Sequence, residues 1–126
     1  MTQQLPSQFE MQILSVLWQD GPLTVRDLRA RLPDGKRRAY TTVLSAMQVM
    51  EKKGFLSHFK EGTANVYQAA IAKPKVLGPF LRRMVTNIFG GSPSNAVQYL
   101  LEDNDISKEE LDQIKALIDH HGDAED

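Results

Sequence analysis

The spacing of the apolar residues changes once along this chain, and that change limits the folds open to it. Segments before Gly54 carry apolar side chains every three or four residues, which is typical of amphipathic helices. After Gly54 the period becomes two, through residues 55–60 and again through residues 64–68, as in β-strands. Residues 61–63, with Gly62 in the middle, form a turn between them. The sequence therefore predicts three helices followed by a two-stranded hairpin.

Capping signals place the first two helices. Ser7 and Glu10 have the spacing of a capping box, in which each side chain accepts a hydrogen bond from a backbone N–H of the first helical turn. Thr24 is placed to cap a second helix, which Pro33 ends. The first helix carries two apolar stripes, so we expect it to pack between neighbours.

A third helix is expected from near Arg37 or Tyr40 to Lys53, and its two faces differ in chemistry. One face carries the apolar residues Val43, Met47 and Met50. The other carries polar residues at i, i+4, i+7 and i+11, namely Thr41, Ser45, Gln48 and Lys52. Three helices and a hairpin, in this order, indicate a winged helix-turn-helix, whose third helix enters the DNA major groove while the hairpin contacts the flanking backbone.

The polar face suits that position, because hydroxyls and amides can contact base edges and cations can contact the phosphates beside them. We predict that double-stranded DNA is contacted by Arg37, Arg38, Tyr40, Thr41, Thr42, Ser45, Gln48, Lys52 and Lys60. The hydroxyls of Thr and Ser and the amide of Gln would contact bases, and the cations would contact phosphates. Tyr40 fits either a stacking contact with the backbone or a place at the core boundary.

Charge is distributed unevenly along a chain whose net charge is only −1. Residues 24–75 carry eleven Lys and Arg against four acids, whereas residues 101–126 carry ten acids against two Lys. A basic segment of this kind indicates an anionic partner for one part of the chain, although a solvated surface explains the same pattern. The acidic segment would be kept away from phosphates, or would serve only to solubilise the tail.

The second half of the chain predicts further helices, one before Gly90-Gly91, a short one around Val97 and one after a second capping-box spacing at Ser107 and Glu110. Together they carry more apolar surface than a small region can cover, so we expect a second copy of the chain to bury it. Packing against the first helix is the alternative. The residues assigned to dimerisation are Leu77, Phe80, Leu81, Met84, Ile88, Val97, Leu111, Ile114, Leu117 and Ile118.

The expected fold class is thus mostly α with a small β-hairpin, a winged helix-turn-helix plus a C-terminal helical dimerisation region. We expect a winged-helix DNA-binding domain over residues 1–72 and the helical dimerisation region over residues 73–126. The polar end, residues 120–126, is expected to fray.

Other chemistries have little support in the sequence. There is no cysteine, which excludes a disulfide, a thiol nucleophile and a cysteine metal site. The histidines lack the partners of a catalytic triad and no glycine-rich phosphate loop is present, so we expect no enzyme, no cofactor and no metal. A weak metal site is the alternative reading of Asp119, His120, His121 and Asp123.

Targeting signals are also missing from the sequence. No apolar run reaches the roughly 18 residues of a membrane helix, and the first residues lack the pattern of a signal peptide. We therefore expect a cytoplasmic protein that does not insert into a membrane.

Three stretches of the chain resemble the penicillinase-repressor family: EMQILSVLWQDGPLTVRDLRARL, AYTTVLSAMQVMEKKGFL and KEGTANVYQ. The tail IFGGSPSNAVQYLLEDNDISKEELDQIKALI extends the likeness over nearly the whole chain. The resemblance implies a homodimeric repressor, with an N-terminal winged helix, that binds an inverted repeat in a promoter. It also implies release by proteolysis, triggered by a membrane-bound zinc-protease sensor of β-lactams.

Several positions depart from that family's pattern. The cleaved Asn-Phe pair aligns with Tyr99-Leu100, so this pair is the proteolytic site by alignment and the release mechanism stays open. The arginines of the third helix and of the hairpin turn align with Val49 and Thr63, which implies a different operator sequence or affinity. The cysteine-rich tail of copper-responsive members is absent.

Two other functions remain open on the sequence alone. Winged helices also serve as protein-interaction modules without sequence-specific DNA binding. A DNA-binding regulator could also hold a small molecule between its two regions, although no polar cluster marks such a pocket.

Overall fold

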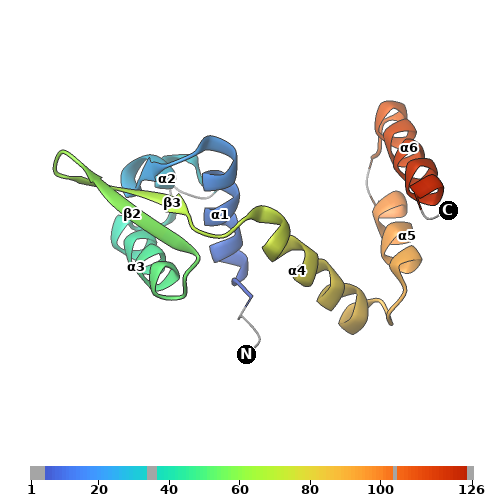
Figure 1. The fold of residues 1–126 in the computed structure, drawn as a ribbon, viewed down its shortest axis with the longest axis horizontal. Coiled ribbons are helices and arrows are strands. Elements are labelled where there is room, and N and C mark those ends of the chain that lie inside the picture. Colours follow the sequence, from blue (N-terminus) through green and yellow to red (C-terminus); the bar gives the residue numbers. More distant parts are fainter. Residues whose placement is uncertain (1–4, 34–36, 104, 125–126) are drawn as a thin grey trace. The chain divides into compact units, whose positions relative to one another are not determined.

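The computed structural model describes residues 5–33, 37–103 and 105–124 (Figure 1). In chain order its elements are α1 (Gln8–Asp20), β1 (Leu23–Thr24), α2 (Val25–Arg31), α3 (Tyr40–Lys52), β2 (Leu56–Glu61), β3 (Ala64–Ala69), α4 (Lys73–Ile88), α5 (Pro93–Asp103) and α6 (Lys108–Ala124). The chain divides into two compact units, Met1–Leu81 and Arg82–Asp126. The expected division between residues 72 and 73 remains a prediction.

The capping signals read from the sequence are present at the first two helices. At α1 the Glu10 N–H donates to Ser7 Oγ at 3.2 Å, and the Ser7 N–H donates to Glu10 Oε1 at 2.9 Å, which confirms the capping box. At α2 the Asp27 N–H donates to Thr24 Oγ1 at 3.2 Å. These bonds satisfy N–H groups that a helix start otherwise leaves without a partner.

The core of the first unit lies where α1, α2 and α3 meet the sheet. The most deeply buried apolar side chains of this core are no more than 2% exposed. They are Ile13, Leu14, Leu28, Val43, Met47, Met50, Phe55, Leu56 and Tyr67. The predicted buried face of α3 is confirmed, because its three apolar residues are completely covered. The opposite face of the same helix is consequently turned outward.

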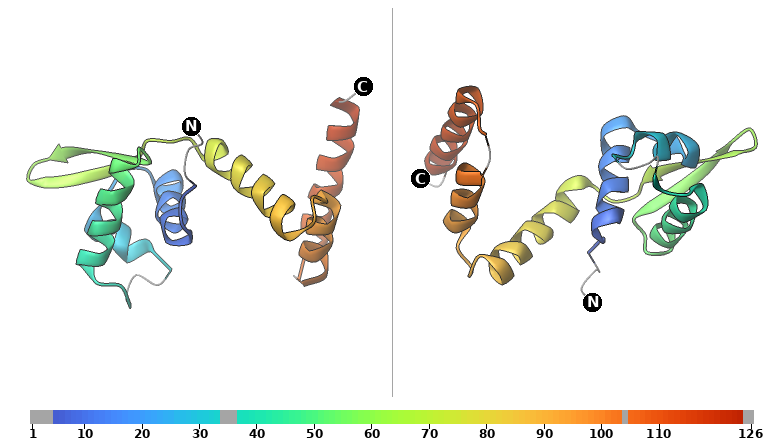
Figure 2. Two further views of the ribbon diagram at one scale, coloured as in Figure 1. Left: turned by 90° about the horizontal axis from the view of Figure 1, so that it is seen from below. Right: turned by 180° about the vertical axis from the view of Figure 1, so that it is seen from behind.

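The predicted hairpin is confirmed as β2 and β3. A third strand, β1, which the sequence did not predict, completes an antiparallel sheet in the order β1-β3-β2. β1 is two residues long, too short to show an alternating pattern, and it pairs Leu23 with Tyr67. In the hairpin, Glu61 pairs with Ala64, which leaves a two-residue turn. Gly62 has φ 65° there, a conformation that glycine adopts at low cost. The hairpin projects beyond the helices (Figure 2).

The first turns of α4 are anchored to the first unit. Trp18 Nε1 on α1 donates to the Ile71 carbonyl at 2.9 Å, just before α4 begins. Val76, one turn into α4, is only 1% exposed. The segment that leaves the hairpin is thereby held against α1.

The second unit comprises the end of α4 with α5 and α6. The rings of Phe89 and Tyr99 lie 5.5 Å apart between centroids, and Ser107 Oγ accepts from the Glu110 N–H at 3.1 Å at the start of α6. The expectation that residues 120–126 fray was wrong as far as Ala124, because α6 continues to that residue. Extending an existing helix adds one backbone hydrogen bond for each residue fixed, which favours continuation even through polar residues. Residues 125–126 lie outside the described part.

Candidate nucleic-acid interface

The outward face of α3 carries the side chains predicted to contact bases. Thr41, Thr42, Ser45 and Gln48 are all exposed, because the apolar residues between them point into the core. Tyr40, at the start of the helix, is 46% exposed and therefore lies outside the core rather than within it. The face offers hydroxyl and amide groups that can both donate and accept hydrogen bonds.

A groove of about 680 Å³ runs between the start of α2, the polar face of α3 and the tip of the hairpin. Its lining residues are Thr24, Val25, Arg26, Asp27, Tyr40, Leu44, Gln48, Thr63, Ala64, Asn65 and Tyr67. The groove therefore brings the predicted Tyr40 and Gln48 together with three residues of the hairpin turn region. Sequence reasoning did not assign Arg26 or Asn65 to the site, although the outward position of Arg26 on α2 was visible in the spacing.

Lys60 lies on the face of the hairpin that borders this groove. Lys60 pairs with Asn65, and His58 pairs with Tyr67, in the β2–β3 register. Residues directly opposite each other in a sheet share a face. Lys60 is thus exposed on the face whose other members, Asn65 and Tyr67, line the groove.

The predicted phosphate-contacting cations differ in their surroundings. Arg37, Lys52 and Lys60 are exposed. Arg38 is partly buried, and its guanidinium carbon lies 3.8 Å from the centroid of the Phe9 ring on α1. Its carbonyl also accepts a 2.6 Å hydrogen bond from Arg29 Nε. Arg38 therefore already helps to join the start of α3 to α1 and α2.

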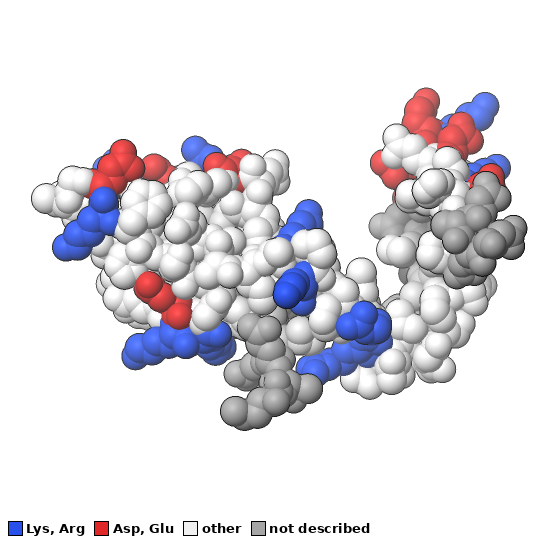
Figure 3. Space-filling view, in the orientation of Figure 1, with Lys and Arg blue, Asp and Glu red and all other residues white. Residues whose placement is uncertain are grey.

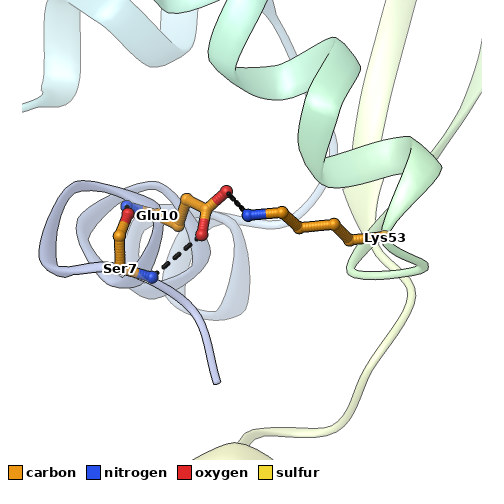
Figure 4. Close-up of polar contacts among 3 residues, drawn as sticks. All are labelled: Ser7, Glu10 and Lys53. Carbon is orange, nitrogen blue, oxygen red and sulfur yellow. Dashed lines mark hydrogen bonds and ion pairs between the residues drawn. The ribbon is translucent and has the colours of Figure 1, made fainter. Parts of the chain in front are cut away.

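Lys53 ties the end of α3 to α1 (Figure 4). Its Nζ lies 2.9 Å from Glu10 Oε2, and Glu10 is only 6% exposed. Burial raises the pKa of Glu10, but the hydrogen bond from the Ser7 backbone, together with the hydrogen bond and charge of Lys53, lowers the pKa overall. No local pattern could indicate this pair, because its members are 43 residues apart in the chain.

A second polar contact joins the hairpin to α3. His58 Nδ1 lies 2.8 Å from both carboxylate oxygens of Glu51, and the His58 ring centroid is 5.2 Å from that of Tyr67. Burial, with the nearby Glu51 and Tyr40, raises the pKa of Tyr67, which lines the groove. Sequence reasoning also missed this contact.

Charge on the molecular surface follows the sequence pattern only in part. On the face seen in Figure 3, basic and acidic side chains both occur over the first unit, basic ones occur along α4, and acidic ones gather on α6 with some basic ones beside them. Among the described residues, no group of three or more histidine or acidic side chains is arranged to hold a metal ion. Asp123, part of the weak metal alternative, lies outside the described side chains.

The residues assigned to dimerisation remain open to solvent to different degrees. Leu77, Phe80, Met84 and Ile114 are partly buried. Those more than a third exposed are Leu81, Ile88, Val97, Leu111, Leu117 and Ile118. Tyr99 and Leu100, on α5, are 54% and 60% exposed. No helix within residues 5–33, 37–103 and 105–124 is long and apolar enough to cross a membrane.

Three helices around an apolar core, with an antiparallel hairpin beside the exposed face of α3, define a winged helix. Comparison with known families gives an assignment for most of the chain. Residues 6–120 match the penicillinase repressor family, and the chain belongs to that family of transcriptional repressors. The penicillinase repressor of Bacillus licheniformis is 22% identical over 115 residues, which cover 91% of this chain and 90% of that protein. The resemblance found in the sequence is thereby confirmed.

Proposed function

We propose that this chain is a homodimeric repressor that binds an inverted-repeat operator in double-stranded DNA and reads it by sequence. The observation that carries the proposal is the polar face of α3, which is exposed beside the groove and the projecting hairpin. A helix of about this length fits the major groove, where every base pair presents a distinct set of donors and acceptors. Membership of a repressor family supports the same function.

Within this proposal the contacts divide by chemistry. Thr41, Thr42, Ser45 and Gln48 contact base edges, and the amide of Gln48 suits adenine. Arg37, Lys52 and Lys60 contact phosphates on either side, since all three are exposed. Arg38 and Tyr40, which line the start of α3, complete the set. Arg38 is partly buried and stacks on Phe9, so we expect it to contribute less than the other cations.

Dimerisation is proposed from the apolar surface of α4, α5 and α6. Leu117 and Ile118 on α6 are 68% and 62% exposed, and Ile88 at the end of α4 is 71% exposed. Burial of a large apolar side chain contributes roughly 1.5–3 kcal/mol, so a second copy that covers these residues would be held firmly. A two-fold dimer would present its α3 helices to half-sites about one DNA turn, roughly 34–36 Å, apart or a multiple of it.

We also propose that cleavage within the C-terminal unit ends repression. Tyr99 and Leu100, at the position of the family's cleaved pair, lie inside α5 and are exposed. A protease must open a helix before it can cut it, so cleavage here would require local unfolding of α5. We propose a membrane-linked sensor protease as the partner in that step. Because a repressor acts on DNA, we also propose that the protein is cytoplasmic.

The test is selection of bound duplexes from a random DNA pool, with affinities of the selected duplexes measured at two salt concentrations. We expect an enriched inverted repeat that is bound far more tightly than random DNA. Lack of enrichment, with binding lost at moderate salt, would leave only attraction to phosphates. That result would refute the repressor proposal in favour of a winged-helix protein-interaction module.

A further inference from the structure

The groove between α3 and the hairpin has a function that follows from the geometry of DNA. The major groove and the flanking minor groove are separated by one sugar–phosphate strand. If α3 lies in the major groove and the hairpin reaches the flanking groove, that strand must pass between them. The cavity of about 680 Å³ lies at this place in the fold.

We propose that this groove seats one sugar–phosphate strand, that Arg26 on α2 binds a phosphate in it, and that Asp27 beside Arg26 opposes that binding. The inference rests on the proposed function and deepens it. It assigns DNA contacts to residues of α2, whereas the proposed function places the base contacts on α3. Both residues line the groove and both are exposed.

Arg26 differs from the other arginines of α2 in its surroundings. Arg29 donates from Nε to the Arg38 carbonyl at 2.6 Å, and Arg31 pairs with Asp20 at 3.2 Å. Arg26 forms no ion pair and no side-chain hydrogen bond with any residue that the structure describes. Its guanidinium can therefore bind phosphate without giving up an existing contact, and its paired N–H groups suit phosphate oxygens.

Neutral donors of the hairpin line the same groove as Arg26. Thr63 supplies a hydroxyl and Asn65 supplies an amide. Side chains of these types make many of the phosphate contacts in protein–DNA complexes. Lys60, on the same face of the hairpin as Asn65, adds a positive charge beside them.

Among the described residues that line this groove, Asp27 is the one acid. Its backbone N–H is bound to Thr24 Oγ1, and its carboxylate sits in the first turn of α2. A carboxylate next to the path of a phosphate strand repels it, so it weakens binding to every sequence alike. We infer that Asp27 limits non-specific binding, and its removal should tighten the hold on random DNA.

The experiment compares the native protein with Arg26→Ala, Arg26→Lys, Asp27→Asn and Arg31→Ala. Arg31→Ala is the matched control, because it removes the same side chain from the same helix but from a residue paired with Asp20. Affinities are measured for the selected operator and for a random duplex at 50 and 200 mM salt. Circular dichroism of each variant confirms that the fold is kept.

Arg26→Ala should weaken binding to both duplexes by a similar factor. One phosphate contact contributes about 0.9 to the slope of log affinity against log salt concentration. Raising the salt from 50 to 200 mM should therefore weaken Arg26→Ala less than it weakens the native protein, by a factor of about 3.5 for each protomer. Arg26→Lys should retain most of the slope, and Asp27→Asn should tighten binding to both duplexes. Arg31→Ala should match the native protein.

Two results would overturn the inference while leaving the repressor function intact. One is native operator binding by Arg26→Ala with an unchanged salt slope. The other is a change of base preference in Arg26→Ala, which would make Arg26 a base contact. If the native protein enriches no operator, the proposed function fails first, and the inference is refuted with it.

Discussion

Replacing Lys53 by Met should destabilise the winged-helix unit, because the change leaves the buried Glu10 carboxylate without its cation. Lys53 Nζ lies 2.9 Å from Glu10 Oε2, and the contact joins the last turn of α3 to the first turn of α1. Met has a similar length and no charge. The substitution therefore removes the ion pair while it keeps most of the apolar packing of the side chain.

The size of the effect follows from the burial of the two partners. Breaking a fully buried ion pair costs about 3–5 kcal/mol. The Lys53 side chain is 31% exposed and the Glu10 side chain 8%, so water replaces part of the lost contact. Glu10 also keeps the hydrogen bond from the Ser7 N–H. We expect a loss of about 2 kcal/mol in the free energy of unfolding, roughly 8–16 °C in Tm for a unit of this size.

The effect of the substitution should depend on pH in a defined direction. The folded-state pKa of Glu10 is below its ordinary value of 4.5, so the ionised carboxylate stabilises the fold above pH 4.5. That stabilisation is lost as the pH falls through the lower, folded-state pKa and the carboxylate becomes protonated. The difference in stability between the native protein and Lys53→Met should therefore be full at pH 7 and shrink in strong acid.

Thermal and urea unfolding, followed by circular dichroism at pH 7 and at acid pH, measure both effects. Lys52→Met is the matched control, since Lys52 is the neighbouring residue on α3 and is exposed. A double-mutant cycle with Glu10→Gln gives the coupling energy of the pair. The reasoning is refuted if Lys53→Met is as stable as Lys52→Met, or if its loss of stability is the same at both pH values.

Three further predictions concern DNA binding, the hairpin and the dimer. Lys60→Ala should weaken binding to all duplexes and reduce the salt slope by about one unit, whereas Gln48→Ala should relax preference by roughly 1–3 kcal/mol at one base pair. Operator and random-duplex titrations would contradict these roles if each variant behaved like the other. Gly62→Val, at φ 65°, should strain the hairpin turn and destabilise the fold, in contrast to Gly62→Asn, as urea unfolding would reveal. Leu117→Asp should dissociate the proposed dimer in sedimentation, and a dimer that persists in this variant would exclude Leu117 from the interface.

The parts of the fold that could be predicted from the sequence are those that depend on residues close together in the chain. The Ser7–Glu10 capping box and the buried stripe of α3 depend on spacings of three to seven residues, so they could be read directly. β1 could not, because a two-residue strand exists only through its pairing with β3, more than forty residues later. The exposed face of α3 followed from the same stripe, since covering one side of a helix leaves the other to solvent.

The contacts that orient α3 could not be predicted for the same reason. Glu10 and Lys53 are 43 residues apart in the chain, and Glu51 meets His58 only because the hairpin folds back on α3. These contacts have a consequence for function. Apolar packing permits small rotations of a helix, whereas hydrogen bonds and ion pairs are directional, so they fix more closely which side of α3 faces outward.

The same contacts change how the positive charge of residues 24–75 should be interpreted. Eleven Lys and Arg occur there, yet Arg31 pairs with Asp20, Lys53 pairs with Glu10, and Arg38 lies over the Phe9 ring. Cations engaged within the fold neutralise few phosphates, so they add little to the salt dependence of DNA binding. The slope measured for the native protein should therefore reflect the exposed cations beside α3 and the groove, and it should fall well short of the value that the composition of the segment implies.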